Sequence, residues 1–374
     1  MVTSVAIYIF VCAWPLFLSS LIKERKIYVT LAFIPYIAVS ALRGFRVGTD
    51  TIQFTSVFQT IIKADWNQLH LFRYEPLFTI FSKLLGYLSE DPHILVFSSS
   101  LFMGICAIYA TQKLSQNPIL SCCLYGLTLI FFINMNVMRQ GMASAIILAS
   151  LPALLHGNRK RFILFAIIGF LFHYSSIFAS CFCYCSYRKS YGDFDNSFRK
   201  NFLLQKKMIC VLFFILPAVV ILLPQLISFV DVDVPYSVYV KNDFYLKFAA
   251  HFLVMAPVLI FLIIQTAKCL NSIQRLYRAI FCMELFLLFL ANVNSSVSRI
   301  VWYFHSLLFL FIPMVVSHRS LQERKQISLE ILVFFTIYAV LMSKILLSEW
   351  GLFPYEFLWN ESIELETSWL DNLI

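Results

Sequence analysis

Apolar segments of about 20 residues recur from one end of this chain to the other, and they limit its fold more than any other feature. A helix needs roughly 20 apolar residues to cross the ~30 Å hydrocarbon core of a bilayer. Apolar residues fill 60% of the 374 positions and charged residues only 13%, unlike the balance of a soluble protein. We therefore predict an all-α polytopic membrane protein in which residues 1–374 form a single integral membrane domain.

The hydropathy pattern predicts about ten full spans separated by polar loops. Two further apolar stretches, 76–88 and 162–187, are predicted to be short or re-entrant elements. An external amphipathic helix that lies along the membrane interface is predicted in the loop 43–75. Its apolar residues recur at helical spacing and are Phe54, Val57, Phe58, Ile61 and Ile62. The ten predicted spans are 4–22, 27–42, 94–112, 118–136, 140–156, 208–230, 247–267, 279–292, 300–317 and 327–347.

The basic residues predict the topology. The formal net charge is +9, but Lys and Arg cluster in short loops between apolar segments, which is typical of cytoplasmic loops rather than of a surface that binds nucleic acid. Both flanks of 162–187 are basic, so a single crossing would place one flank on the wrong side. Two half-length helices that meet at Phe172 to Ser175 avoid this problem, and such a break is tolerated where it lines a wet cavity.

The stretch 76–88 is also predicted not to cross the membrane, because thirteen helical residues cover only about 20 Å, less than the thickness of the hydrocarbon core. With both elements short, the loops 43–75 and 231–246 and the acidic tail 348–374 lie outside, together with both termini. The alternative topology makes both stretches full crossings and leaves some basic loops on the wrong side.

In the favoured topology, several charged and polar residues gather at or near the outer face. An arginine at the centre of a membrane helix costs roughly 2.5–3.5 kcal/mol, so arginines at span ends tend to face water, protein or a bound anion. This convergence is the main functional clue in the sequence. The residues are Arg43, Arg46, Asp50, Arg73, Glu75, Arg139, His173 and Arg299.

Structural explanations compete with functional ones at these positions. Asp50 can be the N-cap of the following helix, with Gln53 completing a pair like a capping box. Arg43 and Arg46 can snorkel toward the membrane interface or hold an anionic head group between paired guanidinium groups. Glu75 can favour the positive end of a helix or accept a proton from a hydroxyl as a general base.

The polar residues later in the chain also allow more than one interpretation. Arg139 and Gln140 begin a span with small residues at four-residue spacing, which favours close helix packing and a site role for Arg139. His173 is a satisfied interior histidine or a residue that borders a cavity. Glu284, deep within a predicted span, is expected to make a structural polar contact or to pair with an arginine.

Motifs for bound cofactors are missing from the sequence. It contains no P-loop, no GxGxxG segment after a strand and no zinc-type spacing of His and Cys. We therefore predict neither a cofactor nor a metal, and Asp50 and Glu75 are the carboxylates that would hold a metal at this face if one binds.

Five short motifs in order resemble the EpsG family of bacterial membrane proteins, which is similar to the Wzy polymerases of O-antigen and capsule. Each motif is weak alone, but together they cover residues 40 to 310. They are R-x-G-T-D (Arg46 to Asp50), E-P (Glu75 and Pro76), R-Q (Arg139 and Gln140), F-H-Y-S (Phe172 to Ser175) and R-x-x-x-Y-F (Arg299 to Phe304).

The resemblance implies a glycosyltransferase of the bacterial inner membrane that joins oligosaccharide units carried on undecaprenyl diphosphate at the outer face. The implied partners are this lipid-linked oligosaccharide, the bilayer and, as a further candidate, a chain-length regulator. On this basis Glu75, His173 or Asp50 is expected to activate the acceptor hydroxyl. The residues expected to bind the diphosphate are Arg139, Arg299, Arg46, Arg43, Arg73 and Gln140.

Two other activities stay open at this point. A transporter or flippase of the lipid-linked oligosaccharide is one, although transporters commonly contain internal repeats and place their sites near the membrane midplane. A transferase like the O-antigen ligases is the other, and the sequence barely separates it from a polymerase.

Overall fold

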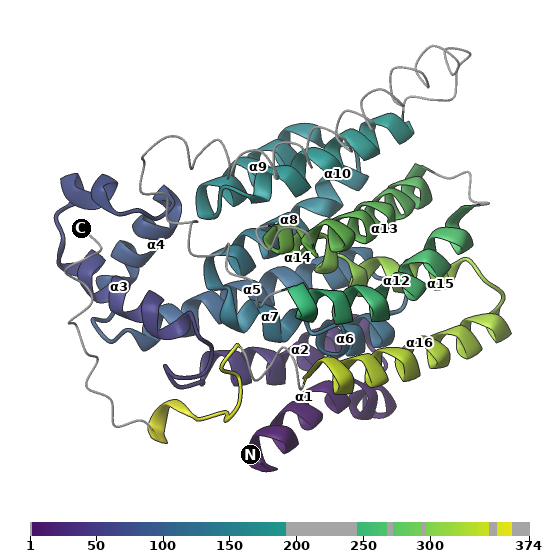
Figure 1. Cartoon of the computed structure of the whole chain (residues 1–374), viewed down its shortest axis with the longest axis horizontal. Coiled ribbons are helices and arrows are strands. Elements are labelled where there is room, and N and C mark those ends of the chain that lie inside the picture. The colour runs from purple at the N-terminus through teal and green to yellow at the C-terminus, as the bar shows by residue number, and fades with distance from the viewer. Residues whose placement is uncertain (1, 192–244, 268–271, 293–296, 344–349, 361–374) are drawn as a thin grey trace. The chain divides into compact units, whose positions relative to one another are not determined.

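The part of the chain that the structure describes is helical, with one isolated β-bridge (Figure 1). The structure is a computed structural model. It forms two compact units, unit 1 (Met1–Ile177 with Ser306–Ile374) and unit 2 (Phe178–His305). The described residues are 2–191, 245–267, 272–292, 297–343 and 350–360.

Unit 1 holds most of the helices. Side-chain caps mark where several of them begin: Glu24 caps α2, Asn117 caps α6, and Ser320 with Glu323 forms a capping box at α16. Its elements are α1 (Val2–Leu21), α2 (Arg25–Ala41), α3 (Thr51–Lys63), η1 (Trp66–Leu71), α4 (Pro76–Gly86), α5 (His93–Leu114), α6 (Pro118–Leu127), α7 (Ile130–Asn136), α8 (Met138–Leu155), α9 (Arg159–Phe172), α15 (Leu308–Ser317), α16 (Leu321–Met342) and η6 (Leu358–Asn360).

Unit 2 contains α12 (Tyr245–Ala267), α13 (Ser272–Ala291) and α14 (Ser298–His305), and α10 (Ser176–Tyr191) begins at the end of the first part of unit 1. Glu284 is fully buried on α13, and its Oε1 lies 2.7 Å from Nδ1 of His305. The predicted structural polar contact is therefore present, and the partner shown is a histidine. A buried carboxylate needs such a partner because desolvation alone is costly.

Four described helices are long and apolar enough to cross a membrane: Thr3–Leu21, His93–Leu114, Met138–Leu155 and Leu321–Met342. Two broken pairs, α6 with α7 and α14 with α15, raise the number to six if each pair is one span. The chain is accordingly a helical membrane protein.

The prediction of ten full spans is not confirmed. The helix predicted at 27–42 is α2, which has 17 residues and begins with two cations. The span predicted at 118–136 is split between α6 and α7, which meet at a 49° bend where Leu129 has a φ of 66°. The span 208–230 and residues 231–244 of the loop 231–246 lie outside the described residues.

Both predicted short elements are present as helices. The stretch 76–88 forms α4, which has only 11 residues. The segment 162–187 is divided into α9 and α10, and the break falls at His173 to Ser175, where the parity of the basic loops placed it. The short helix and the break near His173 are thus confirmed, although α9 begins at Arg159 and α10 ends at Tyr191. The depth of these helices in a membrane stays a prediction.

Helix α8 forms the centre of unit 1. It is buried along nearly its whole length and packs against α5 and α9, while α5 also packs against α2. A Cβ atom on Gly141 would lie 2.8 Å from Sδ of Met103, so the absence of a side chain lets α5 and α8 approach closely. This close packing fixes the start of α8, where Arg139 lies.

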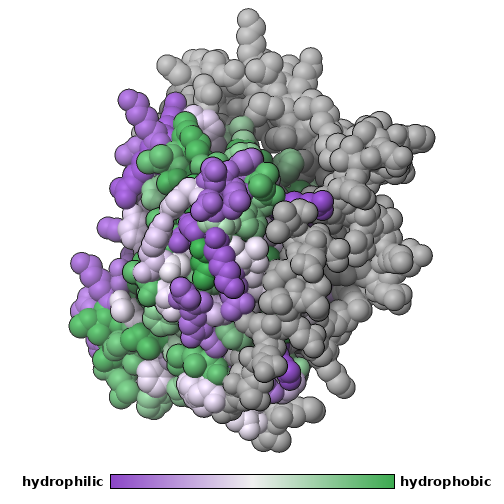
Figure 2. Space-filling view, turned by 90° about the vertical axis from the view of Figure 1, so that its left-hand side faces the viewer, coloured by the Kyte–Doolittle hydropathy of each residue, from purple (hydrophilic) through white to green (hydrophobic). Residues whose placement is uncertain are grey.

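Helix α3 is the predicted amphipathic helix, but its apolar face is not free to lie on a membrane. Val57 and Ile61 are buried in a cluster with Leu69 of η1, and Phe72 and Tyr74 pack against this cluster. The predicted membrane-interface position is therefore not supported, because the protein's own α4 and η1 cover the face. On the left-hand side of Figure 1, where α3 and α4 lie, hydrophilic side chains lie between hydrophobic ones (Figure 2).

The segment 350–360 lies beside the loop that follows α2 (Figure 1, yellow beside purple). Gly44 N–H donates to Glu356 O at 2.9 Å, and Leu358 N–H donates to Leu42 O at 3.0 Å. Further along, Gly48 N–H donates to Gly351 O at 2.9 Å. No sequence pattern predicted this pairing, which ties the described part of the tail 348–374 to the loop 43–75.

We expect Gly48 to be the least replaceable glycine of that loop. Its φ is +95°, and a Cβ atom would lie 2.8 Å from Oγ1 of Thr51. Gly157 is a matched control, because its φ is +76° but a Cβ atom there meets nothing within 4 Å. Gly157→Ala should cost about 1–2 kcal/mol from backbone strain alone, and Gly48→Ala should cost more. Equal decreases in melting temperature in detergent would contradict this expectation.

Candidate active site

Three residues from separate helices meet in unit 1. Glu75 is the residue before Pro76, the first residue of α4, and Pro at that position starts a helix readily. Arg139 lies in the first turn of α8, and His173 is the residue at which α9 ends. Each therefore lies at a helix terminus, where a side chain can point along the helix end instead of into a packed face.

The Glu75 carboxylate joins the other two side chains. Nη1 of Arg139 donates a hydrogen bond to Oε2 of Glu75, and Nδ1 of His173 lies 2.5 Å from Oε1. Glu75 makes no side-chain hydrogen bond to the backbone of α4. Both of its oxygens are instead engaged by distant residues. Glu75 does lie at the N-cap position of α4, so the predicted preference for the positive end of a helix stays a prediction.

Burial makes this cluster electrostatically strong. Glu75 and His173 are each only 4% exposed, whereas the Arg139 side chain is 19% exposed. Burial by itself would raise the pKa of Glu75, but the His173 hydrogen bond and the Arg139 charge outweigh it and lower the pKa to about 2. Glu75 is consequently ionised at neutral pH and is a weak base.

The aromatic rings of the loop surround Arg139. Its guanidinium carbon lies 4.7 Å from the centroid of the Tyr74 ring, 5.3 Å from that of Phe54 and 5.9 Å from that of Phe78. A cation over aromatic faces at these distances is stabilised by the ring quadrupoles. The rings stabilise the guanidinium without accepting hydrogen bonds from it. Nη1 donates to Glu75 and Nε is buried without a partner among the described residues, so Nη2 carries the donors that stay available to an anion.

The Glu75 contact also fixes the histidine. With Nδ1 donating to an ionised carboxylate, the imidazole keeps its proton on Nδ1, and Nε2 is left as the basic nitrogen. Within the described residues, the imidazole of His173 makes no hydrogen bond other than the one to Glu75. The arrangement can therefore take a proton at Nε2 and present a positive charge at Arg139.

Asp50 lies at the start of α3, close enough to Tyr74 for its charge to act on that ring. Its side chain makes no capping hydrogen bond, so the predicted capping pair with Gln53 is wrong. Instead, the Asp50 N–H donates to Oδ1 of Asn136 at 3.2 Å, and Gln53 donates to the Tyr74 hydroxyl at 3.3 Å. Burial raises the pKa of Tyr74, Arg139 opposes this effect, and the Asp50 charge adds a smaller increase.

Arg43 is the most buried of the predicted arginines. It is fully buried, with Nη1 donating to Ser40 O at 2.5 Å and Nη2 donating to Met135 O at 2.9 Å. These bonds tie the end of α2 to the end of α7. They favour a structural role for Arg43, and its predicted contact with a diphosphate stays untested.

The other predicted site residues are more dispersed. Arg46 and Arg73 are exposed on the loop 43–75, and Gln140 is buried beside Arg139 on α8. Arg299 lies in the first turn of α14 and belongs to unit 2. Among the residues described, no three His, Cys, Asp or Glu side chains form a group that could hold a metal ion.

The aromatic residues of this site were not predicted from the sequence. Phe54 was assigned to an interfacial helix face, and Tyr74 was not singled out although it lies between Arg73 and Glu75. A Tyr beside a buried carboxylate in an external loop was the available signal. Phe78 carried none, because it resembles any other apolar helix residue.

We expect acid to weaken the fold through Glu75. A carboxyl with a pKa lowered from 4.5 to about 2 stabilises the folded state above about pH 4.5, and this contribution is lost as the pH falls toward 2. The shift corresponds to about 3 kcal/mol. The difference in melting temperature between the wild type and Glu75→Gln should therefore narrow between pH 5 and pH 3. A constant difference would show that Glu75 is not ionised in the folded protein.

The helices and the buried cluster show that this is a polytopic helical membrane protein with a site made of Glu75, His173 and Arg139. The chain matches the EpsG family over residues 26–357 and belongs to this family of Wzy-like polysaccharide polymerases. Neither the curated proteins nor the solved structures gave a match. The family membership gives the protein a role of the polysaccharide-polymerase type in a membrane.

Proposed function

We propose that this protein is a glycosyltransferase that polymerises oligosaccharide units carried on undecaprenyl diphosphate, at the periplasmic face of the bacterial inner membrane. The observation that carries the proposal is the buried Glu75, whose two oxygens hold His173 and Arg139 in place. An oriented base beside a guanidinium group is what transfer of a glycosyl group from a diphosphate requires.

In this mechanism, His173 acts as the general base. Nε2 takes the proton of the acceptor hydroxyl as the hydroxyl oxygen attacks the anomeric carbon of the donor. The new C–O bond forms while the bond from that carbon to the diphosphate oxygen breaks, and undecaprenyl diphosphate leaves with the electron pair. The proton remains on Nε2 until water or the released diphosphate accepts it.

Glu75 acts as a positioning residue in this scheme. Its pKa of about 2 makes it a poor proton acceptor, but its charge fixes the tautomer of His173 and stabilises the imidazolium that forms. Of the three residues predicted as general base, we therefore assign the role to His173. In this scheme Asp50 acts on the loop beside Tyr74, because its charge raises the pKa of the Tyr74 hydroxyl.

Arg139 would stabilise the negative charge that develops on the leaving diphosphate. A guanidinium has five N–H donors, and Glu75 uses only one edge of it. Because the site is buried, each charge interaction is stronger there than in water. Arg46 and Arg73, which are exposed on the loop 43–75, are secondary candidates for binding the same diphosphate.

The test is polymerisation by the purified protein in liposomes that contain lipid-linked units. We expect a ladder of products whose spacing equals one repeat unit. Movement of single units across the bilayer with no ladder would identify a flippase. Transfer of one finished chain to a different lipid acceptor, again with no ladder, would identify a ligase-like enzyme.

A further inference from the structure

A second polar site lies in unit 1, at the opposite end from the Glu75 cluster. It is a cavity of about 670 Å³ between the end of α1, the beginnings of α2 and α6, the end of α15 and the first turns of α16. Arg25 begins α2, and Arg43 follows its last turn. The 17 residues of α2 therefore separate the two ends by about 26 Å at 1.5 Å per residue.

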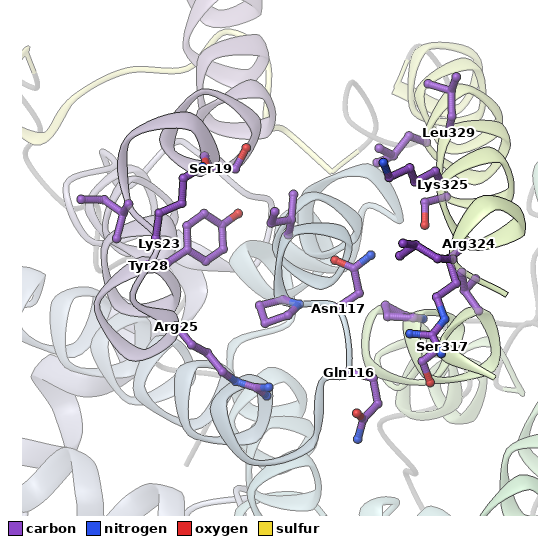
Figure 3. A pocket seen from close by; sticks show the side chains of 18 residues that line it. Ser19, Lys23, Arg25, Tyr28, Gln116, Asn117, Ser317, Arg324, Lys325 and Leu329 are labelled. Atoms are coloured by element: carbon purple, nitrogen blue, oxygen red, sulfur yellow. The ribbon is translucent and has the colours of Figure 1, made fainter. Parts of the chain in front are cut away.

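Four cations line this cavity from two walls. Lys23 and Arg25 come from the α1–α2 side, and Arg324 and Lys325 come from α16 on the facing side (Figure 3). No Asp or Glu is among the lining residues. The cavity thus concentrates positive charge on two opposed surfaces.

The contacts of these cations leave their charge uncompensated. Arg25 donates to Ser115 O at 2.5 Å, Lys23 donates to Ser19 O at 3.2 Å, and Arg324 donates from Nε to Arg319 O at 2.6 Å. All of these acceptors are neutral backbone carbonyl groups. Within the described part of the chain, none of the four forms an ion pair.

The nearby carboxylates are engaged elsewhere. Glu24 accepts hydrogen bonds from the N–H groups of Lys26 and Ile27, at 3.1 and 2.6 Å. Glu323 accepts from the N–H and the hydroxyl of Ser320, at 3.0 and 2.8 Å. Both acidic residues therefore serve as helix caps, and the four cations are available to an anion from outside the chain.

The apolar part of the lining shows what kind of anion fits. Ile119, Leu321 and Leu329 line the cavity and are 39%, 71% and 63% exposed. Beyond the cavity, α16 exposes Val333 and Ile337 along the same helix, at 52% and 55%. A soluble anion would leave these side chains in contact with water, whereas acyl chains would cover them.

We propose that this cavity binds the head group of an anionic membrane lipid that carries two phosphates. The two phosphates would lie against the two cationic walls, and the acyl chains would run along α16. Basic pockets between membrane helices on the cytoplasmic side are suited to such head groups. The clustered Lys and Arg residues also predict that this end faces the cytoplasm. The proposal is independent of the polymerase reaction.

The test uses the full-length protein in nanodiscs of phosphatidylethanolamine with a small fraction of diphosphatidylglycerol or phosphatidylglycerol. Lipid that stays bound after extraction is measured by native mass spectrometry. We expect the lipid with two phosphates to be retained preferentially. The double variant Lys23→Gln with Lys325→Gln should bind it about 30-fold more weakly, since each Lys near a membrane surface contributes about one factor of five.

The matched control is Lys113→Gln with Lys160→Gln. These residues are exposed near the same end of unit 1, do not line the cavity and give the same change in net charge. Equal losses in the two double variants would overturn the proposal in favour of general surface charge. Displacement of the lipid by millimolar inorganic diphosphate would overturn it in favour of a soluble anion. Unchanged melting temperatures of both variants would show that the comparison concerns folded protein.

Discussion

His173→Ala should reduce chain growth by about 10²–10⁴-fold, the range that loss of a general base typically causes. The imidazole is the one group of the cluster with a basic nitrogen that Glu75 leaves unused. Without it, the acceptor hydroxyl would have to lose its proton to water. The measurement is the rate at which product ladders lengthen in liposomes that contain equal amounts of folded protein.

His156→Ala is the matched control for this variant. His156 follows the last residue of α8 and is exposed, at the opposite end of that helix from Arg139. It should keep the wild-type rate. A His173→Ala protein that still builds long chains at the normal rate would remove His173 from the mechanism and would return the role of base to Asp50 or Glu75.

Arg139→Ala should reduce both stability and activity. Removing the cation leaves the Glu75 carboxylate buried with only His173 as its partner, and breaking a buried pair typically costs about 3–5 kcal/mol. The stacking on the Tyr74 ring would also be lost. We expect a clear decrease in melting temperature in detergent and almost no polymer.

A double variant separates the two effects. Arg139→Met with Glu75→Gln removes both charges while it keeps much of the volume, so it should recover most of the lost stability. It should not recover polymerisation, because the diphosphate would still lack its cation. Recovery of both properties would mean that polymerisation needs neither charge, and that Arg139 serves only to compensate the buried Glu75 carboxylate. Recovery of neither would indicate that the ring contacts around Arg139 dominate its contribution.

The sequence predicted the helical membrane class and the short elements because both depend on local properties. Hydropathy over about 20 residues identifies a span, and the parity of basic loops indicates the break at His173. The predicted number of ten full spans is not confirmed, because the described residues contain four helices long and apolar enough to cross a membrane, or six spans if each broken pair is counted as one. Helix breaks such as the one at Leu129 depend on backbone conformations that hydropathy does not report.

The candidate site was predicted as a set of residues but not as an arrangement. Glu75, Arg139 and His173 were all named, together with six others, and nothing in the sequence showed which of the nine residues meet. Only the burial and the contacts of these side chains separate the three residues that meet from the other six candidates. Arg43 is held by backbone carbonyl groups inside the protein, whereas Arg139 is held by a carboxylate and three rings beside a partly open surface.

By itself, the sequence determined the class of the protein, its family motifs and the helix ends at which the polar residues lie, because these follow from neighbours within one or two turns. Only the tertiary structure decided that Glu75 joins Arg139, 64 residues away, to His173, 98 residues away. It also decided that the segment 350–360 pairs with the loop 43–75. Contacts at such separations depend on how whole helices pack, and no local periodicity carries that information.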